Sequence, residues 1–326
     1  MRKTAGIDIG KYSIKLIEIE HKKGYPEITK AALRRVVDGD TKTALEDVVS
    51  VSKLSLKHVN VSLSGPSVIV RYIEMPPMKK EELNSAIRFE AEKYIPFDIK
   101  DSIIDCAVLD KVSTSSQRVL LVAARKNYVN NMLELLKGAG LEINAVDIDS
   151  FALLNSFQRT NLDNKNENTC ALINIGAKFL NMNIITKGRA YFTRDILWGG
   201  IDVTNRIKDA TGLSLEDAEA LKKNPNEKRE ELVGIIVPVL ERLTSQVRMS
   251  LDYFESQFGK CVEKIYISGG TAYLFNMVDF LKDNLGVDTL MWNPFDNIRI
   301  SESMTEKEVS AMPAVFAVAV GLALRT

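Results

Sequence analysis

Apolar residues alternate with polar ones in two similar stretches of this chain. Residues 7–19 read IDIGKYSIKLIEI and residues 173–185 read INIGAKFLNMNII, and the two align without gaps at an offset of 166 positions. Each predicts a strand, a glycine turn and a second strand, followed by a Lys-Gly pair (23–24 and 187–188) that would start a third strand. Such segments also recur by chance, but equivalent copies in both halves favour a duplicated lobe.

The rest of the first half predicts further strands and helices. Strands are expected at 27–37, 58–64 and 68–75, with a helix at 42–54. After two prolines at 76–77, a compact inserted unit is expected, with a helix, two strands, a helix and a strand at 79–93, 103–110, 117–124, 126–138 and 142–147.

A polar stretch at 159–168 has no apolar periodicity and separates the halves as a linker would. The second half predicts helices at 200–210, 215–223 and 228–257, then a strand at 264–268 that ends in two glycines. Two more helices and a short strand follow. This alternation favours α/β sheets covered by helices.

Length and composition exclude several classes of function. The 326 residues are enough for two lobes, each with its own core, and 43 basic residues balance 43 acidic ones, so nucleic acid is not an expected partner. Three scattered cysteines fit reduced thiols, and two histidines, His21 and His58, leave little for a histidine-based catalytic or metal site. A cytoplasmic protein is expected.

Neither end of the chain predicts a membrane segment. The apolar stretch behind the basic N-terminus is broken at once by Asp8, so no signal peptide is expected. The most apolar run, at 311–324, has 14 residues and falls short of the roughly 20 that a spanning helix needs. It predicts a buried helix.

The two glycine turns carry the candidate chemistry. The backbone N–H groups of such a turn can point at phosphate oxygens, and glycine permits a close approach that a Cβ would block. Asp8 precedes the first turn and Asn174 the second. The sequence therefore predicts a nucleotide held between two lobes.

The residues also resemble a known family, the PilM type IV pilus assembly proteins, which are related to FtsA within the actin, Hsp70 and sugar-kinase superfamily. The resemblance covers essentially the whole chain. It rests on GIDIGKYSIKLIEI (6–19), EMPPMKKEELNSAIRFEAEKYIPF (74–97), LLVAARK (120–126), VDIDSFAL (146–153), FTRDILWGG (192–200), AEALKK (218–223), ISGGTAYL (267–274) and VGLALR (320–325).

The resemblance implies an actin-like (ribonuclease-H-like) two-lobed α/β fold with a duplicated core and an FtsA-type 1C subdomain. The implied division is 1A at 1–78 and 148–160, 1C at 79–147, 2A at 161–198 and 261–326, and 2B at 199–260.

It also implies ATP and magnesium as cofactors. Asp8 would orient the metal, which prefers a hard anionic oxygen, although a turn aspartate can also bond backbone amides. The expected nucleotide-binding set is Asp8, Gly10, Lys11, Tyr12, Ser13, Lys15, Asn174, Gly176, Ala177, Lys178, Gly200, Glu219, Lys222, Gly269, Gly270 and Thr271. Lys15 is open to a second interpretation as a solvated strand lysine, and Glu219 with Lys222 to one as a surface ion pair.

Two positions bear on hydrolysis. Asn174 departs from the family, which usually has an aspartate there, and an amide cannot supply the charge that tunes magnesium. Asp149 stands where relatives keep an acidic group that positions the attacking water, and it could equally cap the following helix. ATP binding with at most slow hydrolysis is expected.

The family implies a protein partner as well, the N-terminal peptide of a PilN-type membrane protein, taken into a groove between 1A and 1C. Arg71, Arg88 and Tyr94 are the expected lining residues. The predicted function is a cytoplasmic ATP-binding adaptor that reaches the inner membrane through this partner and connects it to the pilus motor ATPases. An FtsA-like filament protein and a weak ATPase or kinase are the alternatives.

Overall fold

The computed structural model describes residues 2–160, 168–302, 304 and 311–325. The first lobe is built on a six-stranded sheet in the order β14-β3-β2-β1-β4-β8. Its strands are β1 (Arg2–Ile9), β2 (Ser13–Lys22), β3 (Tyr25–Arg35), β4 (His58–Leu63), β8 (Glu142–Ile148) and β14 (Arg299–Ile300). One face packs against α1 (Thr41–Ser52) and α3 (Lys126–Gly138), around a core that includes Ile7, Leu45, Val61 and Leu136.

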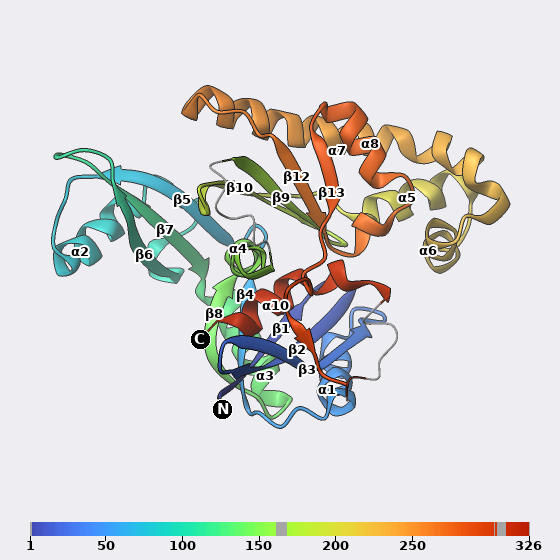
Figure 1. Ribbon diagram of the computed structural model, residues 1–326, viewed down its shortest axis with the longest axis horizontal. Coiled ribbons are helices and arrows are strands. Elements are labelled where there is room, and N and C mark those ends of the chain that lie inside the picture. Colours follow the sequence, from blue (N-terminus) through green and yellow to red (C-terminus); the bar gives the residue numbers. More distant parts are fainter. Residues whose placement is uncertain (1, 161–167, 303, 305–310, 326) are drawn as a thin grey trace.

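The second lobe has a five-stranded sheet in the order β11-β10-β9-β12-β13 (Figure 1). Its strands are β9 (Thr169–Ile175), β10 (Leu180–Thr186), β11 (Arg189–Ile196), β12 (Lys264–Ser268) and β13 (Asp288–Met291). The helices α5 (Gly200–Thr211), α6 (Leu215–Lys223), α7 (Arg229–Phe258) and α8 (Met277–Leu285) belong to this lobe, and the long α7 lies along its outer side.

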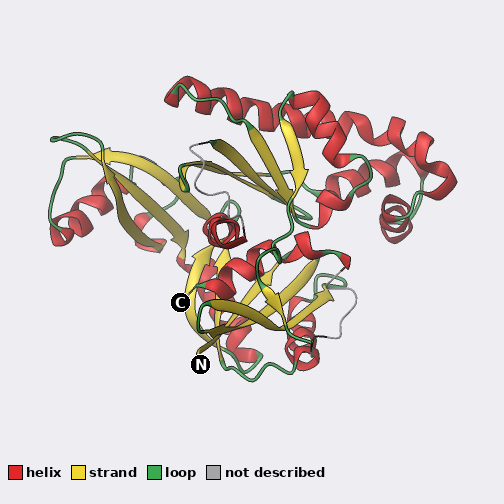
Figure 2. Ribbon diagram, in the orientation of Figure 1, coloured by secondary structure: helices red, strands yellow, loops and turns green. Residues whose placement is uncertain are grey.

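Two helices form a layer between the lobes, where Figures 1 and 2 show α4 and α10 side by side. They are α4 (Asp149–Thr160) and α10 (Ala317–Leu324), the latter preceded by a short 3-10 turn, η4 (Pro313–Phe316). Their backbones approach so closely that a Cβ on Gly321 would collide with the carbonyl of Ala152. Leu172 of the second sheet packs in the same cluster as Leu153 and Leu322 of these helices.

A third, smaller unit projects from the first lobe (Figure 1). It has a three-stranded antiparallel sheet in the order β5-β7-β6, formed by β5 (Val68–Met75), β6 (Ser102–Lys111) and β7 (Gln117–Arg125). Helix α2 (Lys80–Ala91) covers one face with Leu83, Ile87 and Ala91.

The predicted repeat is confirmed in its geometry. Asp8 pairs with Lys15 in the first hairpin, and Asn174 pairs with Asn181 at the same place in the second. Most predicted helices and strands lie within about two residues of their expected bounds. The final apolar run is buried from Ala314 to Ala323, whereas Ala311 and Met312 at its start are exposed, and within it η4 leads into the helix α10.

Three assignments to subdomains disagree with the sheets. Residues 68–75 were expected in 1A, but β5 pairs with β7 in the small unit, whereas β8 was expected in 1C and pairs with β4 of the first lobe. Residues 261–326 were expected wholly in the second lobe, but β14 pairs with β3 and α10 packs on β1 of the first. The reason is that the chain crosses back to the first lobe after β13. The predicted linker lies largely outside the described residues.

Candidate functional site

The two glycine turns have the same internal hydrogen bond. The Gly10 N–H donates to the carbonyl of Ser13 at 3.2 Å, and the Gly176 N–H donates to that of Phe179 at 3.0 Å. A Cβ on either glycine would stand 2.9 Å from the accepting oxygen, which is closer than side-chain carbons approach. Both turns therefore require glycine. The first turn joins β1 to β2, and the second joins β9 to β10.

The first turn is flanked by an ion pair. Lys15 Nζ lies 3.0 Å from the Asp8 carboxylate, and both side chains are largely buried. The interpretation of Lys15 as a solvated strand lysine is therefore wrong, because its ammonium lies at the base of the turn beside Asp8. Ser13 is buried and Lys11 is exposed.

Asp149 is the first residue of α4 and accepts a hydrogen bond from Ser62 Oγ at 2.6 Å. Burial, followed by the negative charge of Asp8, raises the pKa of Asp149 to about 7, against the effect of the Ser62 hydroxyl. Asp195 contributes to the same electrostatic effect. The carboxylates of Asp8 and Asp195, which lie on two other elements, therefore both raise the pKa of Asp149.

Asn174 belongs to a chain of hydrogen bonds that ends on Asp195. Asn174 Nδ2 donates to Asn181 Oδ1 at 3.1 Å, and Asn181 Nδ2 donates to Asp195 Oδ1 at 2.8 Å. Ser268 Oγ lies 3.3 Å from the remaining oxygen of Asn174. Because a carboxylate only accepts, Asp195 sets the direction of both amides. Position 174 lacks an acidic side chain, and the carboxylate nearby is that of Asp195 on β11.

Asp195 also connects the two lobes. Its other oxygen accepts the backbone N–H of Gly65, in the loop between β4 and β5, at 2.7 Å. Burial raises the pKa of Asp195, and the bonds from Asn181 and Gly65 oppose that rise. Asp195 was not among the site residues expected from the sequence. A charged residue directly before the buried Ile196 was the available signal in the sequence, but the residues that Asp195 contacts belong to other elements.

The strand β12 ends beside the second turn. Thr271 Oγ1 donates to the Gly176 carbonyl at 2.9 Å, and Gly269 has a φ of 88°, where a Cβ would stand 2.8 Å from Asn174 Oδ1. Gly269 and Gly270 were expected to open a helix. They open η3 (Gly270–Tyr273), a single 3-10 turn, and α8 begins only at Met277. A four-residue turn has no macrodipole comparable to that of an α-helix.

Gly200 and Ala177 hold the second turn against α5. The Gly200 N–H donates to the Gly176 carbonyl at 3.0 Å, and the Ile201 N–H to the Ala177 carbonyl at 2.9 Å. A Cβ on Gly200 would lie 2.6 Å from Thr271 Oγ1. The turn, α5 and Thr271 are therefore packed directly together, whereas the neighbouring Lys178 is exposed.

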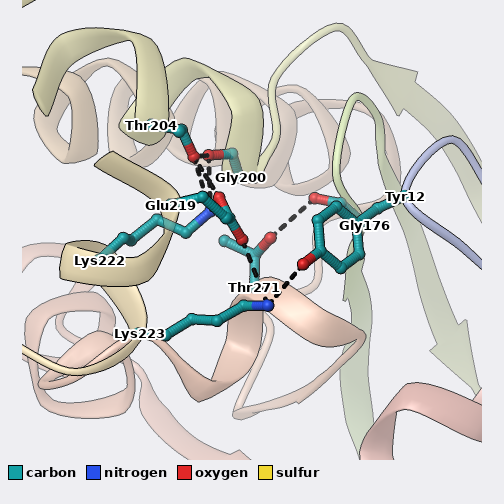
Figure 3. A network of polar contacts seen from close by, with 8 residues as sticks. All are labelled: Tyr12, Gly176, Gly200, Thr204, Glu219, Lys222, Lys223 and Thr271. Carbon is teal, nitrogen blue, oxygen red and sulfur yellow. Dashed lines mark hydrogen bonds and ion pairs between the residues drawn. The ribbon is translucent and has the colours of Figure 1, made fainter. Parts of the chain in front are cut away.

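Glu219 and Lys222 form a buried cluster with α5 (Figure 3). Lys222 Nζ lies 2.5 Å from Glu219 Oε2, 2.8 Å from Thr204 Oγ1 and 3.1 Å from the Gly200 carbonyl. Burial lowers the pKa of Lys222, and Glu219 opposes that shift. The alternative of a surface ion pair is wrong, because only 11% and 16% of the two side chains are exposed.

The first turn reaches the second lobe through Tyr12. Lys223 Nζ lies 2.5 Å from the Tyr12 hydroxyl and 4.6 Å from the centre of its ring (Figure 3). Lys223 is the last residue of α6, directly after the anchored Lys222. Tyr12 was expected in the nucleotide-binding set, but the contact of its side chain with the other lobe could not be expected from the sequence.

The three expected partner-binding residues lie on the small unit. Arg71 is exposed on the edge strand β5, Arg88 is exposed on α2, and Tyr94, just beyond α2, is 37% exposed. Asn84, on the same flank of α2 as Arg88, contacts Cys106 on β6, at the opposite edge of the sheet from Arg71. The described contacts do not bring these residues together.

Two further properties concern metals and membranes. Within the described part of the chain, no three His, Cys, Asp or Glu side chains gather closely enough to hold a metal ion. Among the same residues, no helix has the length and apolar character needed to cross a membrane.

Solved structures resemble this one over nearly its full length. A structure described as the "PilM-PilN type IV pilus biogenesis complex" matches at 30% identity and a TM-score of 0.90, covering 99% of this chain and 98% of that one. The ethanolamine utilization protein EutJ from Carboxydothermus hydrogenoformans matches at 16% identity and a TM-score of 0.58, covering 100% and 90%.

MreB5 of Spiroplasma citri bound to AMPPNP matches at 13% identity and a TM-score of 0.51, covering 98% and 95% of the two chains. The last two likenesses concern the fold, which is actin-like. The family model "Type IV pilus assembly protein PilM" matches residues 6–326. With its two glycine turns and its added three-stranded unit, this chain belongs to the PilM family of type IV pilus assembly proteins.

Proposed function

We propose that this chain is a nucleotide-dependent adaptor of type IV pilus assembly, which holds ATP between its lobes and binds the tail of a membrane partner. The observation that supports it most directly is the pair of equivalent glycine turns, one in each lobe, with identical hairpin hydrogen bonds. Backbone amides in such turns are suited to phosphate oxygens.

The surroundings of the turns suit a nucleotide. Lys15, Lys11 and Lys178 supply positive charge around the first and second turns, and anionic phosphates favour such a site. The buried pair of Glu219 and Lys222, with Thr271 and Gly270, would hold the ribose and base. Gly270 has open space where a Cβ would stand, which leaves room beside it for a ligand.

Asp8 would hold magnesium, because the ion usually takes one or two carboxylates together with substrate phosphates. When bound, the ion would neutralise phosphate charge. Lys15 already accompanies the Asp8 carboxylate at 3.0 Å, so the lysine would contribute to the phosphates from the same position.

Rapid hydrolysis is not expected. The neutral amide of Asn174 is committed to Asn181, and the carboxylate of Asp195 to Gly65 and Asn181. Asp149, with its pKa raised to about 7, could still accept a proton from water, so the expectation of slow hydrolysis rests on Asn174 and Asp195. The site therefore favours binding over turnover.

The partner proposal starts from the relative that is described as a complex with PilN. The small three-stranded unit would form a groove with the first lobe and capture an N-terminal PilN-type peptide there, through a strand edge and apolar side chains. Arg71, Arg88 and Tyr94 remain the proposed lining residues. The partner would place the protein at the inner face of the membrane and connect it to the pilus motor.

Thermal unfolding tests the nucleotide site. ATP with magnesium should raise the melting temperature, phosphate release should stay near background, and Asp8→Ala should remove the magnesium dependence. Gly234→Ala is a matched control, because Gly234 is exposed on α7. Absence of a shift at millimolar ATP would disprove nucleotide binding.

A pull-down tests the partner site. An N-terminal peptide of the PilN-type protein should bind the wild type, and Arg71→Ala, Arg88→Ala and Tyr94→Ala should each weaken binding. Because Arg71 and Arg88 lie towards opposite edges of the sheet, the single variants show which edge faces the groove. Unchanged binding in all three would remove these residues from the proposed site.

A further inference from the structure

The contact between Tyr12 and Lys223 joins the two lobes at the candidate nucleotide site. Tyr12 is fixed in the first lobe by its backbone, because its carbonyl accepts the N–H of Val36 at 2.8 Å. Its side chain leaves that lobe and meets Lys223 of α6 (Figure 3). One hydrogen bond of 2.5 Å and one cation–π contact of 4.6 Å thus join the two lobes.

Both partners are held in place by their neighbours. Lys222 is bonded to Glu219, Thr204 and Gly200, so the end of α6 is anchored to α5. Lys223 also lies 3.7 Å from the other oxygen of Glu219, and a cation at a helix C-terminus is favoured by the helix dipole. On the other side, the Arg35 guanidinium lies 5.1 Å from the centre of the Tyr12 ring.

Tyr12 therefore stands between two cations at the turn that would receive phosphates. A neutral phenol is a weaker partner for an ammonium than a phosphate, because the phosphate carries full charges of the opposite sign. A phosphate-bearing ligand can thus displace the phenol from Lys223. A nucleoside has no anionic oxygen with which to do so.

We propose that Tyr12 and Lys223 form a latch that closes the cleft in the ligand-free protein and that the phosphates of an entering nucleotide open it. The inference rests on the proposed nucleotide site and adds to it a selection for phosphorylated ligands. Lys223 changes partner on binding, from the phenol of one lobe to the ligand.

Association kinetics test the latch. With the fluorescent nucleotide mant-ATP, Tyr12→Phe removes the hydrogen bond and keeps the ring, and it should speed association by roughly threefold to tenfold, since a bond to a charged group is worth about that factor or more. Lys223→Met also removes the cation–π contact, so the double variant with Tyr12→Phe should speed association by less than the product of the two single-variant factors, because both substitutions act on one contact. Adenosine should not compete with mant-ATP in the wild type.

Two matched variants serve as controls. Tyr253→Phe removes the hydroxyl of an exposed tyrosine on α7, and Lys208→Met removes a lysine on α5 that pairs with its neighbour Asp209. Both should leave association unchanged. Equal association rates in the wild type and Tyr12→Phe would overturn the latch, as would additive effects in the double variant.

Hydrogen–deuterium exchange without nucleotide separates the two proposals. If the latch exists, Tyr12→Phe should speed exchange in the last turn of α6, and Lys223→Met should speed it at 10–13, in the opposite lobe. Unchanged exchange across the cleft would overturn the latch even if nucleotide binds. The two methods could also disagree, with faster exchange in the variants but no binding of mant-ATP by any protein. The contact between the lobes would then stand, but both its opening by nucleotide and the proposed nucleotide site would be disproved.

Discussion

The amide of Asn174 has its direction imposed by a carboxylate two strands away. Asp195 can only accept, so Asn181 donates to it and turns its own carbonyl towards Asn174, which must donate in turn. An aspartate at 174 would place its carboxylate against that carbonyl. The departure from the family pattern at 174 is therefore coupled to Asp195.

This coupling predicts a rescue. Asn174→Asp should lower the free energy of unfolding by about 1–3 kcal/mol, because an acceptor then faces an acceptor. Adding Asp195→Asn lets the Asn181 amide flip, so that it donates to the carboxylate at 174 and accepts from the new amide at 195, whose oxygen can still accept the Gly65 N–H. The second substitution should therefore restore most of the loss. Urea unfolding of the single and double variants measures these free energies of unfolding. A double variant that is less stable than both single variants would contradict the prediction.

Asp149 predicts a dependence of stability on pH. Its pKa rises on folding, from an ordinary carboxyl value to about 7. The folded state therefore binds the proton more tightly, and stability falls as the pH rises from about 4 to 7 before it levels off.

Asp149→Asn tests this effect, because the amide oxygen can still accept from Ser62 without carrying a charge. The variant should be more stable than the wild type at pH 8, by up to about 4 kcal/mol, and similar to it near pH 4. Melting temperatures across that range would show it. Parallel pH profiles for the two proteins would mean that Asp149 does not titrate as described.

At the scale of elements, α10 depends on glycine at its contacts. Gly321 lies against the carbonyl of Ala152 on α4, and Gly6 on β1 lies against the backbone of α10 at Ala319. No side chain fits at either place. The helix is therefore held by direct backbone packing on both a strand and a helix.

Gly321→Ala should consequently destabilise the protein by about 3 kcal/mol or more, since overpacking forces backbone shifts. Gly234→Ala, on the exposed side of α7 with no atom near its Cβ, should stabilise it by about 0.5–1 kcal/mol through helix propensity. Melting temperatures that move in the same direction for the two variants would contradict this packing argument.

The periodicity of the sequence identified elements well but not their partners. The two hairpins were predictable because each needs only local alternation and a glycine turn, and Gly10 and Gly176 occupy equivalent places. The strands predicted at 68–75 and 142–147 were recognised as strands, but their sheets differ from the subdomains to which they were assigned, because strand pairing depends on distant residues. Asp195 and the Tyr12 side chain were missed for the same reason.

At the scale of the whole molecule, the small unit is attached to the second lobe as well as to the first. The Tyr72 hydroxyl of β5 lies 2.9 Å from Thr193 Oγ1 on β11. Thr193 donates to Asn183, whose amide donates to the Ser150 carbonyl beside Asp149. Polar contacts thus run from the unit that would bind the partner to the helix that carries Asp149.

Tyr72→Phe should therefore loosen the small unit and cost about 1 kcal/mol of stability. Hydrogen exchange should become faster in β5 and β11 together. Tyr253→Phe, which removes the hydroxyl of an exposed tyrosine on the same lobe as Thr193, is the control. Faster exchange in β5 alone would argue that the unit is independent of the second lobe.

The return of residues 313–324 to the first lobe has a consequence for biosynthesis. The first sheet buries Ile17 and Ile28 against Phe316 and Ala319, which are translated after the whole core of the second lobe. The second lobe draws its core from about 171–285, so it can fold while translation continues. The lobe translated first is thus the last to be completed, and until then its apolar face is a substrate for chaperones.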